Sequence, residues 1–311
     1  MTSVDDGRAT SSADALATGC AGCFGTKGTG AQLAHSLPIA VLALHVVAAW
    51  SHTREPQETQ WLATMKSVSE LRSALADELA AAVRSVVERS DHQEVPISTR
   101  VVYGDPAKAL VDESGDDRLL VVGSRGRGAL AGLILGSVSQ ACAQYSRGPV
   151  IVVRGSAPTD GIGRVVVGVD GSADSLLALR FAASAARLRG TPLEVVHVWQ
   201  ETDHAAHGRL GPVGESAKAQ ADREWQRILR STLAVAPDVE IISKHLPGYA
   251  QSVLLRASEG AALLVVGSRG RGGWAGLLLG SVSLRCITLS ACPVAVVRAP
   301  ATAQGLRDAD G

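Results

Sequence analysis

Aromatic residues, net charge and long apolar runs are all scarce in this sequence, and each shortage excludes classes of protein. Aromatic side chains make up 3% of the 311 residues, so a core must consist mainly of Ala, Val and Leu. Such a core suits helices packed on a buried parallel sheet. Lys and Arg number 30 together, as do Asp and Glu. We therefore expect no nucleic acid and no anionic membrane as a partner, because no net charge attracts either.

No segment is typical of export or of membrane insertion. The longest apolar stretch, residues 37–50, spans 14 residues and contains a proline and a histidine. It is too short to cross a bilayer. Residues 1–20 contain three aspartates and lack the basic beginning of a secretory signal. We therefore expect a cytoplasmic protein.

The sequence also lacks a cysteine framework. Its five cysteines are Cys20, Cys23, Cys142, Cys286 and Cys292. Cys20 and Cys23 form one CxxC pair, but no second Cys or His pair completes a zinc site, so we interpret them as loop residues. Cys142 and Cys286 are predicted to be small buried residues on helices. Reduced thiols are consistent with the cytoplasm.

What the sequence does contain is a duplication. Residues 121–154 match residues 265–298 at 23 of 34 positions without a gap, at an offset of 144. The same offset pairs Gly104 with Gly248 upstream of the match. A match of this length identifies a tandem repeat of two copies.

The small, polar and Pro- and Gly-containing segment 155–163 marks the boundary between the two copies. We therefore place a first domain at residues 1–155 and a second at residues 164–299. A flexible tail is expected at residues 300–311.

Copy two alternates short Val- and Leu-rich runs with helical segments. Strands are expected at 164–170, 193–199, 239–245, 262–266 and 293–297, and helices at 172–189, 215–233, 251–259 and 280–289. This alternation predicts an α/β fold in which right-handed crossovers build a parallel sheet.

Each copy also contains the pattern Gly-x2-Gly-x9-Gly-Ser directly after a Val-Val strand. Its members are Gly123, Gly126, Gly136 and Ser137 in copy one, and Gly267, Gly270, Gly280 and Ser281 in copy two. A glycine turn at the carboxyl end of a strand lets backbone N–H groups approach phosphate oxygens. Gly-Ser at the next helix start adds N–H donors, a hydroxyl and the positive end of the helix dipole. Two copies with the same spacing favour phosphate binding over glycines that only shape tight turns.

The pattern differs from two better-known phosphate motifs. The sequence has neither a GxxxxGK[ST] loop nor a GxGxxG fingerprint after a strand. Residues 25–30, GTKGTG, resemble both slightly but follow no expected strand, so we interpret them as a loop.

Three features together resemble the universal stress protein family in its tandem two-domain form: the glycine spacing, GVDGS at residues 168–172 and VVHVW at residues 195–199. The resemblance covers nearly all of copy two, and copy one from about His45. It implies two doubly wound α/β domains of the adenine nucleotide alpha hydrolase-like kind. Each would have a five-stranded parallel sheet in the order 3-2-1-4-5, with the nucleotide over strands one and four. ATP is the usual ligand of members that bind one, and Mg²⁺ is its candidate companion.

The resemblance also assigns roles to residues. Asp170 would face the ribose and the phosphates or their metal, and Val198 would hold the adenine through its backbone. The phosphates would contact Gly267, Gly270, Gly280, Ser281 and Ser283 in copy two, and Gly123, Gly126, Gly136, Ser137 and Ser139 in copy one. From the residues alone, Asp170 is also a candidate helix cap. His197 and His45 are expected to be packed strand residues rather than catalysts, and no metal site is predicted.

Copy one departs from the pattern at its beginning. In place of VVVGVDGS it has residues 1–16, where Asp5 or Asp6 is a candidate for the missing aspartate. Residues 17–36 show no amphipathic helical period. We therefore expect the first strand and helix of copy one to be degenerate or rebuilt, and expect one complete nucleotide site, in copy two.

The leading hypothesis is an ATP-binding stress-response regulator that is essentially non-catalytic. A slow ATPase and a nucleotide-independent scaffold paired through its fifth strands are the alternatives. No signature of adenylate-forming enzymes, serine elbow or carboxylate pair beside the motif is present. The GSRGRG arginines, Arg125, Arg127, Arg269 and Arg271, are either phosphate ligands or solvated loop charges. The two domains are expected to pair within one chain, and a homodimer is a further candidate.

Overall fold

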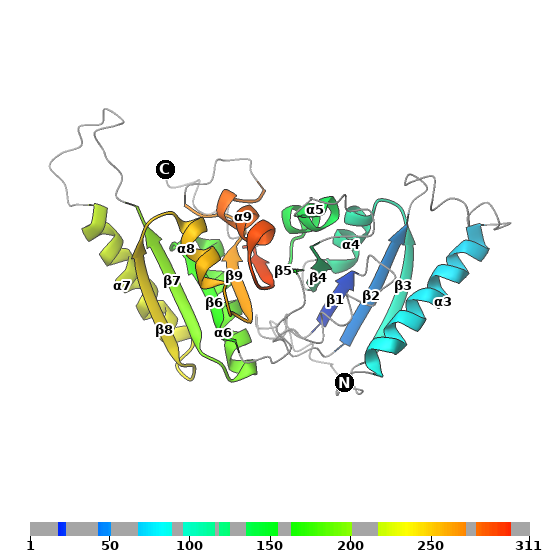
Figure 1. The fold of residues 1–311 in the computed structure, drawn as a ribbon, viewed down its shortest axis with the longest axis horizontal. Coiled ribbons are helices and arrows are strands. Elements are labelled where there is room, and N and C mark those ends of the chain that lie inside the picture. Colours follow the sequence, from blue (N-terminus) through cyan, green and yellow to red (C-terminus); the bar gives the residue numbers. More distant parts are fainter. Residues whose placement is uncertain are drawn as a thin grey trace, which may run out of the picture.

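The structure is a computed structural model that describes residues 18–22, 43–50, 68–88, 96–115, 118–124, 135–154, 163–200, 217–271 and 278–299. Within these residues ten strands form one sheet with helices on both faces (Figure 1). The strands are β1 Thr18–Gly22, β2 Ala43–Trp50, β3 Ile97–Tyr103, β4 Leu119–Gly123, β5 Val150–Val153, β6 Val165–Val169, β7 Leu193–Trp199, β8 Ile241–Pro247, β9 Leu263–Gly267 and β10 Val294–Val297. The helices are α3 Val68–Val87, α4 Pro106–Ser114, α5 Ser137–Tyr145, α6 Ala173–Arg189, α7 Ala217–Val235, α8 Ala250–Ala257 and α9 Ser281–Leu289.

The sheet consists of two halves with the same internal order. The first half runs β3-β2-β1-β4-β5, and the second, read from the other edge, runs β8-β7-β6-β9-β10. All pairs within each half are parallel. The predicted pair of doubly wound α/β units is confirmed.

Two apolar layers fill the space between the sheet and its helices. One layer packs strand side chains against α3, α6 and α7, and includes Leu79, Phe181 and Trp225. The other packs them against α4, α5, α8 and α9, and includes Leu110 and Leu254. Because both faces of the sheet are covered, most of its central strands, such as β4 and β9, are nearly continuous runs of Val and Leu, and β1 is the exception.

Local sequence explains why α6 begins and ends where it does. The Ser172 side chain caps the helix by accepting the N–H of Ser175. Gly190 ends the helix in the left-handed conformation, with φ of +62°. Seven of the nine residues that α6 buries are apolar, mostly alanine, so it lies close against the sheet. The cap therefore fixes the start of α6 shortly after the end of β6.

The two halves join through their fifth strands. β5 and β10 are antiparallel, with Ile151 opposite Ala295 and Val152 opposite Val294, all of them buried. This pairing forms the centre of the molecule in Figure 1. The expected pairing of the two domains within one chain is therefore what the structure contains.

Arginines at the ends of β5 and β10 reinforce this junction. The Arg298 guanidinium donates to the carbonyls of Ala143 and Gln144 at the end of α5, at 3.5 and 2.9 Å, and to that of Leu278 at 2.6 Å. Arg154, its counterpart in copy one, donates to the Ile287 carbonyl of α9 at 3.4 Å. A cation at the carboxyl end of a helix also stabilises the helix dipole.

The first strand of copy one, expected to be degenerate or rebuilt, is present as β1. β1 lies between β2 and β4, where β6 lies in copy two. Its sequence, TGCAG, has no β-branched apolar residue, so its strand propensity is low and its neighbours impose the conformation. Cys20 is therefore a strand residue, not a loop residue. Cys23, residues 25–30, Asp5 and Asp6 lie outside the described residues, and both aspartates precede β1 rather than follow it.

The prediction for Cys142 and Cys286 is confirmed. Both lie on helices, α5 and α9, and neither is exposed to solvent. Burial, and then the nearby Cys292, raise the pKa of the Cys286 thiol to about 12. Among the described residues, no helix is long and apolar enough to cross a membrane.

Replacing Arg298 with alanine should weaken the junction between the halves. The substitution leaves helix-end carbonyls of α5 without their charged donor, so we expect the free energy of unfolding to fall by about 1–3 kcal/mol. Urea unfolding followed by circular dichroism measures this loss. The control is Arg187→Ala, which breaks an exposed pair with Asp238 and should cost less than about 1 kcal/mol. Equal losses from both variants would show that Arg298 contributes no more than a surface ion pair.

Candidate functional site

A crevice opens where β6 lies beside β9. The chain leaves β6 into α6 on one face of the sheet and leaves β9 toward α9 on the other face. Ligands of open α/β sheets bind at the carboxyl ends of such divergent strands. In copy two this position holds a cavity of about 460 Å³.

The cavity brings together every copy-two residue that the sequence predicted. Its lining includes Asp170, Val198, Gly267, Gly270, Gly280, Ser281 and Ser283. These residues come from the ends of β6, β7 and β9 and from the first turn of α9. Segments that are separate in the sequence therefore line one cavity.

Asp170 stands at the carboxyl end of β6 as an ionised acceptor. Its Oδ1 accepts the hydroxyl and N–H of Ser172, at 2.6 and 3.0 Å, and its Oδ2 accepts the N–H of Arg271 at 2.9 Å. Burial opposes ionisation, but the hydrogen bonds from Ser172 and Arg271 outweigh it and hold the pKa of Asp170 below its ordinary value. The helix cap is Ser172, so Asp170 fixes the turn between β6 and α6 instead.

The glycines of the motif are required because the loop passes very close to its neighbours. A Cβ at Gly270 would lie 2.5 Å from Oδ2 of Asp170. A Cβ at Gly267 would lie 2.9 Å from the backbone of Asp174 in α6. The Gly267 clash is with backbone, and the Gly270 clash is with a carboxylate that three hydrogen bonds hold in place. The glycines therefore let the backbone of the loop approach the floor of the cavity.

The first turn of α9 supplies a second set of backbone donors. Its N-cap is Gly280, which has no side-chain oxygen with which to accept the N–H groups of that turn. The Ser281 hydroxyl lines the cavity beside them. Ser283 differs, because its hydroxyl donates to the Gly267 carbonyl at 2.6 Å. It thus ties α9 to the end of β9.

One side of the cavity is apolar. Val196 and Val198 from β7 and Leu254 from α8 line it, with Leu254 4% exposed. The opposite side, which includes Asp170, the glycine loop and the first turn of α9, is polar. The cavity therefore combines an apolar side with a polar one, as small-molecule sites commonly do.

Arg269 and Arg271 both line the cavity, but Arg271 also has a protein partner. Its guanidinium lies 2.6 Å from a carboxylate oxygen of Glu224 on α7. The other Glu224 oxygen lies 3.0 Å from Arg227. Glu224 is 7% exposed. The ion pair therefore joins the glycine loop to α7, a contact that sequence spacing did not reveal. Arg125 and Arg127 lie outside the described residues.

Asp174 is a second residue that the sequence did not single out. It lies in the first turn of α6, directly under the start of the glycine loop, and is 4% exposed. In the sequence it reads as an ordinary acidic residue near a helix N-terminus. No local pattern distinguishes it from other acidic residues in a first helical turn.

A family model described as the universal stress protein family matches residues 28–154 and 161–298. The chain belongs to the universal stress protein family. A universal stress protein of Mycolicibacterium smegmatis is 34% identical over 278 residues, which cover 85% of this chain and 88% of that protein. One from Mycobacterium tuberculosis is 34% identical over 223 residues, covering 68% of this chain and 73% of that protein.

Solved structures show the same fold. The crystal structure of a universal stress protein from Archaeoglobus fulgidus superposes with a TM-score of 0.65 and 21% identity, covering 91% of this chain and 98% of that one. At this identity the likeness concerns the fold alone. It extends across both halves, so the tandem arrangement is a shared architecture.

Copy one of this universal stress protein anchors its motif as copy two does, where its residues are described. Gly123 ends β4, Gly136 is the N-cap of α5 and Ser137 begins that helix. The Ser139 hydroxyl donates to the Gly123 carbonyl at 2.6 Å, as Ser283 does to Gly267. Gly126 lies outside the described residues. The anchoring of the two motifs is therefore the same where both are described.

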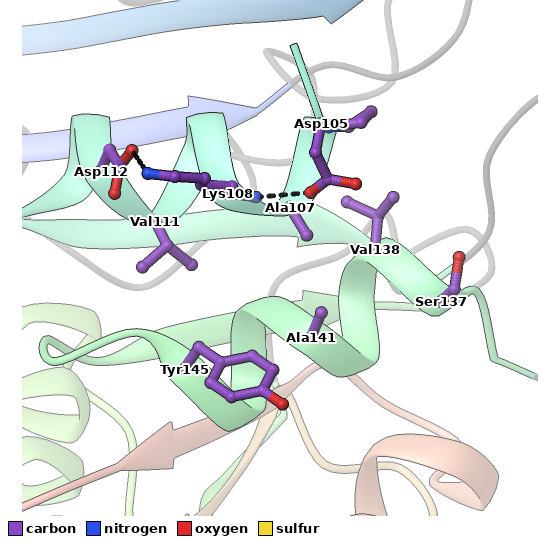
Figure 2. Close-up of a pocket in the computed structure, with 10 residues that line it drawn as sticks. Asp105, Ala107, Lys108, Val111, Asp112, Ser137, Val138, Ala141 and Tyr145 are labelled. Atoms are coloured by element: carbon purple, nitrogen blue, oxygen red, sulfur yellow. Dashed lines mark hydrogen bonds and ion pairs between the residues drawn. The ribbon is translucent and has the colours of Figure 1, made fainter. Parts of the chain in front are cut away.

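A second cavity, of about 380 Å³, lies between α4 and α5 in copy one (Figure 2). Its lining includes Asp105, Lys108, Val111, Asp112, Ser137, Val138, Ala141 and Tyr145. The charged side chains at its rim already have partners. The Lys108 ammonium lies 2.5 Å from the Asp112 carboxylate, and the backbone N–H of Lys108 donates to the Asp105 carboxylate at 2.9 Å. Ser137 alone of the predicted residues lines it. This groove does not reproduce the copy-two site.

The two predicted packed histidines lie on strands that correspond, but at different positions. His197 on β7 pairs in register with His245, whereas His45 on β2 pairs with Ser98. Because Trp50 and Trp199 occupy matching ends of these strands, His45 corresponds to Glu194 rather than to His197. Among the described residues, no group of three or more His, Cys, Asp or Glu side chains could hold a metal ion.

His197 belongs to a stack of rings under α7. Its ring lies 5.0 Å from that of His245 and 5.9 Å from that of Trp225. The two histidines approach at 2.8 Å between their Nδ1 atoms, and His245 Nε2 lies 3.0 Å from Asp222. Because a carboxylate only accepts, His245 donates to Asp222, and a neutral His245 then accepts from His197. Only one of the two Nδ1 atoms can carry a proton at this distance, so the two rings are not both protonated.

Acid should destabilise the protein through His197. Burial, and then the charge of His245, lower its pKa to about 4, although the carboxylates of Glu224 and Asp170 oppose this. An unfolded histidine has a pKa of about 6.5. Between pH 6.5 and 4 the unfolded chain therefore binds a proton at this residue that the folded chain does not bind. The contribution of His197 to the free energy of unfolding is complete above pH 6.5 and is lost as the pH falls toward 4.

We expect His197→Gln to remove this pH-dependent part of the free energy of unfolding. The unfolding free energy of the wild type should decline relative to the variant by up to about 1.4 kcal/mol per pH unit between pH 6.5 and 4. Urea unfolding at half-unit pH steps measures the difference, with pH 7.5 as the baseline. A wild-type-to-variant difference that stays constant from pH 7.5 to 4 would contradict the depressed pKa.

Proposed function

We propose that this universal stress protein binds ATP in the copy-two cavity and acts as a nucleotide-dependent, essentially non-catalytic regulator of a stress response. One observation carries the proposal: the glycine loop, the first turn of α9 and Asp170 converge on one cavity beside an apolar wall. Backbone N–H groups at a helix N-terminus and a glycine turn suit phosphate. The apolar wall suits the base.

Each part of the ligand has a proposed place. The adenine would lie against Val196, Val198 and Leu254, with the Val198 backbone holding its polar edge. The ribose hydroxyls would face Asp170. The phosphates would accept from the loop backbone at Gly267 and Gly270 and from the Gly280–Ser281 turn, with Ser283 anchoring that turn from behind.

Magnesium fits this arrangement only as a companion of the phosphates. Asp170 is the single carboxylate that lines the cavity among the described residues. Mg²⁺ commonly takes one or two carboxylates together with phosphate oxygens and water. Asp170 would supply the protein ligand, and the metal would neutralise phosphate charge.

The same geometry favours binding over turnover. A general base works best with a pKa near the working pH, whereas the pKa of Asp170 is lowered and its oxygens already accept three hydrogen bonds. The Arg271 guanidinium, which would stabilise charge on a transferred phosphoryl group, is paired with Glu224. We therefore propose storage or sensing of the nucleotide rather than its rapid hydrolysis.

The proposal predicts micromolar ATP binding by the wild type and its loss in Gly270→Val. The new Cβ would lie 2.5 Å from Asp170 Oδ2, so the loop and the carboxylate must move apart, and the hydrogen bond from the Arg271 N–H to that oxygen is disturbed. We expect affinity to fall at least about tenfold, which corresponds to about 1.4 kcal/mol. Isothermal titration calorimetry measures both proteins.

The matched control is Gly126→Val, the equivalent substitution in copy one. It should leave the copy-two site intact, with a stoichiometry near one ATP per chain. No heat with the wild type would refute ATP binding. Equal losses in both variants would show that the site is not confined to copy two. Mass spectrometry of nucleotide retained through purification identifies the ligand independently.

We also expect very slow ATP hydrolysis, far below the roughly 1–10³ per second of ordinary enzymes. The measurement is inorganic phosphate release at saturating ATP and Mg²⁺, with Gly270→Val as the background control. Sustained release within the enzymatic range that Gly270→Val abolishes would favour the ATPase alternative.

A further inference from the structure

One buried carboxylate beneath the copy-two loop has no place among the proposed ligand contacts. Oδ2 of Asp174 accepts the hydroxyl of Ser268 at 2.6 Å and the N–H of Arg269 at 3.1 Å. Its Oδ1 accepts the N–H of Ala299 at 2.9 Å. Asp174 does not line the cavity. It therefore joins the start of α6 to the beginning of the glycine loop and to the chain after β10.

Ser268, which makes the shortest of these hydrogen bonds to Asp174, contacts both ends of the loop. The Ser268 carbonyl accepts the N–H of Gly280 at 2.8 Å, and the Ser268 N–H donates to the Val297 carbonyl at 2.6 Å. Gly280 is the N-cap of α9. The position of Ser268 thus determines where the loop begins and where the helix that closes it begins.

From these contacts we infer that Asp174 is the positioning residue for phosphate binding, an inference that rests on the proposed ATP site. Three donors from two segments, the start of the glycine loop and the chain after β10, point at one carboxylate that is 4% exposed. No neutral side chain of the same size offers acceptors to all three, because the asparagine amide would place a donor opposite one of them. The loop must then shift, and with it the backbone N–H groups that face the phosphates.

The effect should be specific to phosphate. Val196 and Val198 lie on β7 and Leu254 on α8, and no hydrogen bond joins Asp174 to these residues. The wall for the base therefore remains when the loop moves. A nucleoside without phosphates reports on that wall alone.

Copy one supports the inference by contrast. Ser124 repeats the backbone contacts of Ser268, accepting the N–H of Gly136 at 2.7 Å and donating to Val153 at 2.7 Å. Yet residues 23–42, which connect β1 to β2 as α6 connects β6 to β7, contain no Asp or Glu. The carboxylate that holds the loop in copy two thus has no counterpart in the equivalent connection.

The experiment compares ATP with adenosine by calorimetry in the wild type, Asp174→Asn and Asp238→Asn. We expect Asp174→Asn to lower ATP affinity at least tenfold while adenosine affinity stays within twofold of the wild type. Asp238→Asn makes the same chemical change at an exposed partner of Arg187 and should alter neither affinity. A thermal melt of each protein verifies folding.

A parallel loss of ATP and adenosine affinity, or no loss of either, would overturn the positioning role. Ser268→Ala removes one donor to Asp174 and should cause a smaller, still phosphate-selective loss, about threefold for ATP. If Asp174→Asn does not fold, an unchanged ATP affinity in Ser268→Ala overturns the inference. Absence of ATP binding by the wild type refutes the proposed function, and the inference with it. Wild-type binding without phosphate selectivity in either variant refutes the inference alone.

Discussion

The contact between β6 and β9 determines where this molecule can hold a ligand. These neighbouring strands send the chain to opposite faces of the sheet, so their carboxyl ends leave a gap that no crossover fills. The close packing of the Gly267 backbone against the start of α6 then brings the glycine loop over that gap. Asp170, at the end of β6, and the first turn of α9 face each other across it. Every polar feature of the cavity follows from this one adjacency.

The antiparallel pairing of β5 with β10 has a different consequence. It joins two parallel half-sheets into one, removes an exposed edge from each half, and buries short Val-rich strands that have little polar surface of their own. Arg298 spans this junction, since it donates both to α5 in copy one and to the Leu278 carbonyl near the end of the copy-two loop. The copy-two loop is therefore connected to the first half of the chain through Arg298, the residue directly after β10.

Much of this architecture could be predicted because the duplication and the hydrophobic pattern are strong. The expected helix at 172–189 and strand at 193–199 match α6 and β7 closely, whereas the strand expected at 239–245 is observed two residues later. β8 is an edge strand of intermediate burial, so its apolar alternation is weak and its limits depend on pairing with β7. β1 was missed for a related reason: its small residues carry little strand propensity, and only its position between β2 and β4 makes it a strand. The contacts of Asp174 and Glu224 join segments far apart in the sequence, which no local pattern records.

The two copies differ in the carboxylates around the glycine loop and not in the spacing of the loop itself. The glycine spacing and the serine that anchors the helix are present twice, and where both are described they make the same hydrogen bonds. These features preserve the shape of a strand–helix turn. Carboxylates that orient the loop and face the cavity come from the connection after the first strand, and in copy one that connection contains neither Asp nor Glu. A repeat can therefore retain its glycine spacing and its contribution to the central sheet while the carboxylates that contact the loop in the other copy are absent from the equivalent connection.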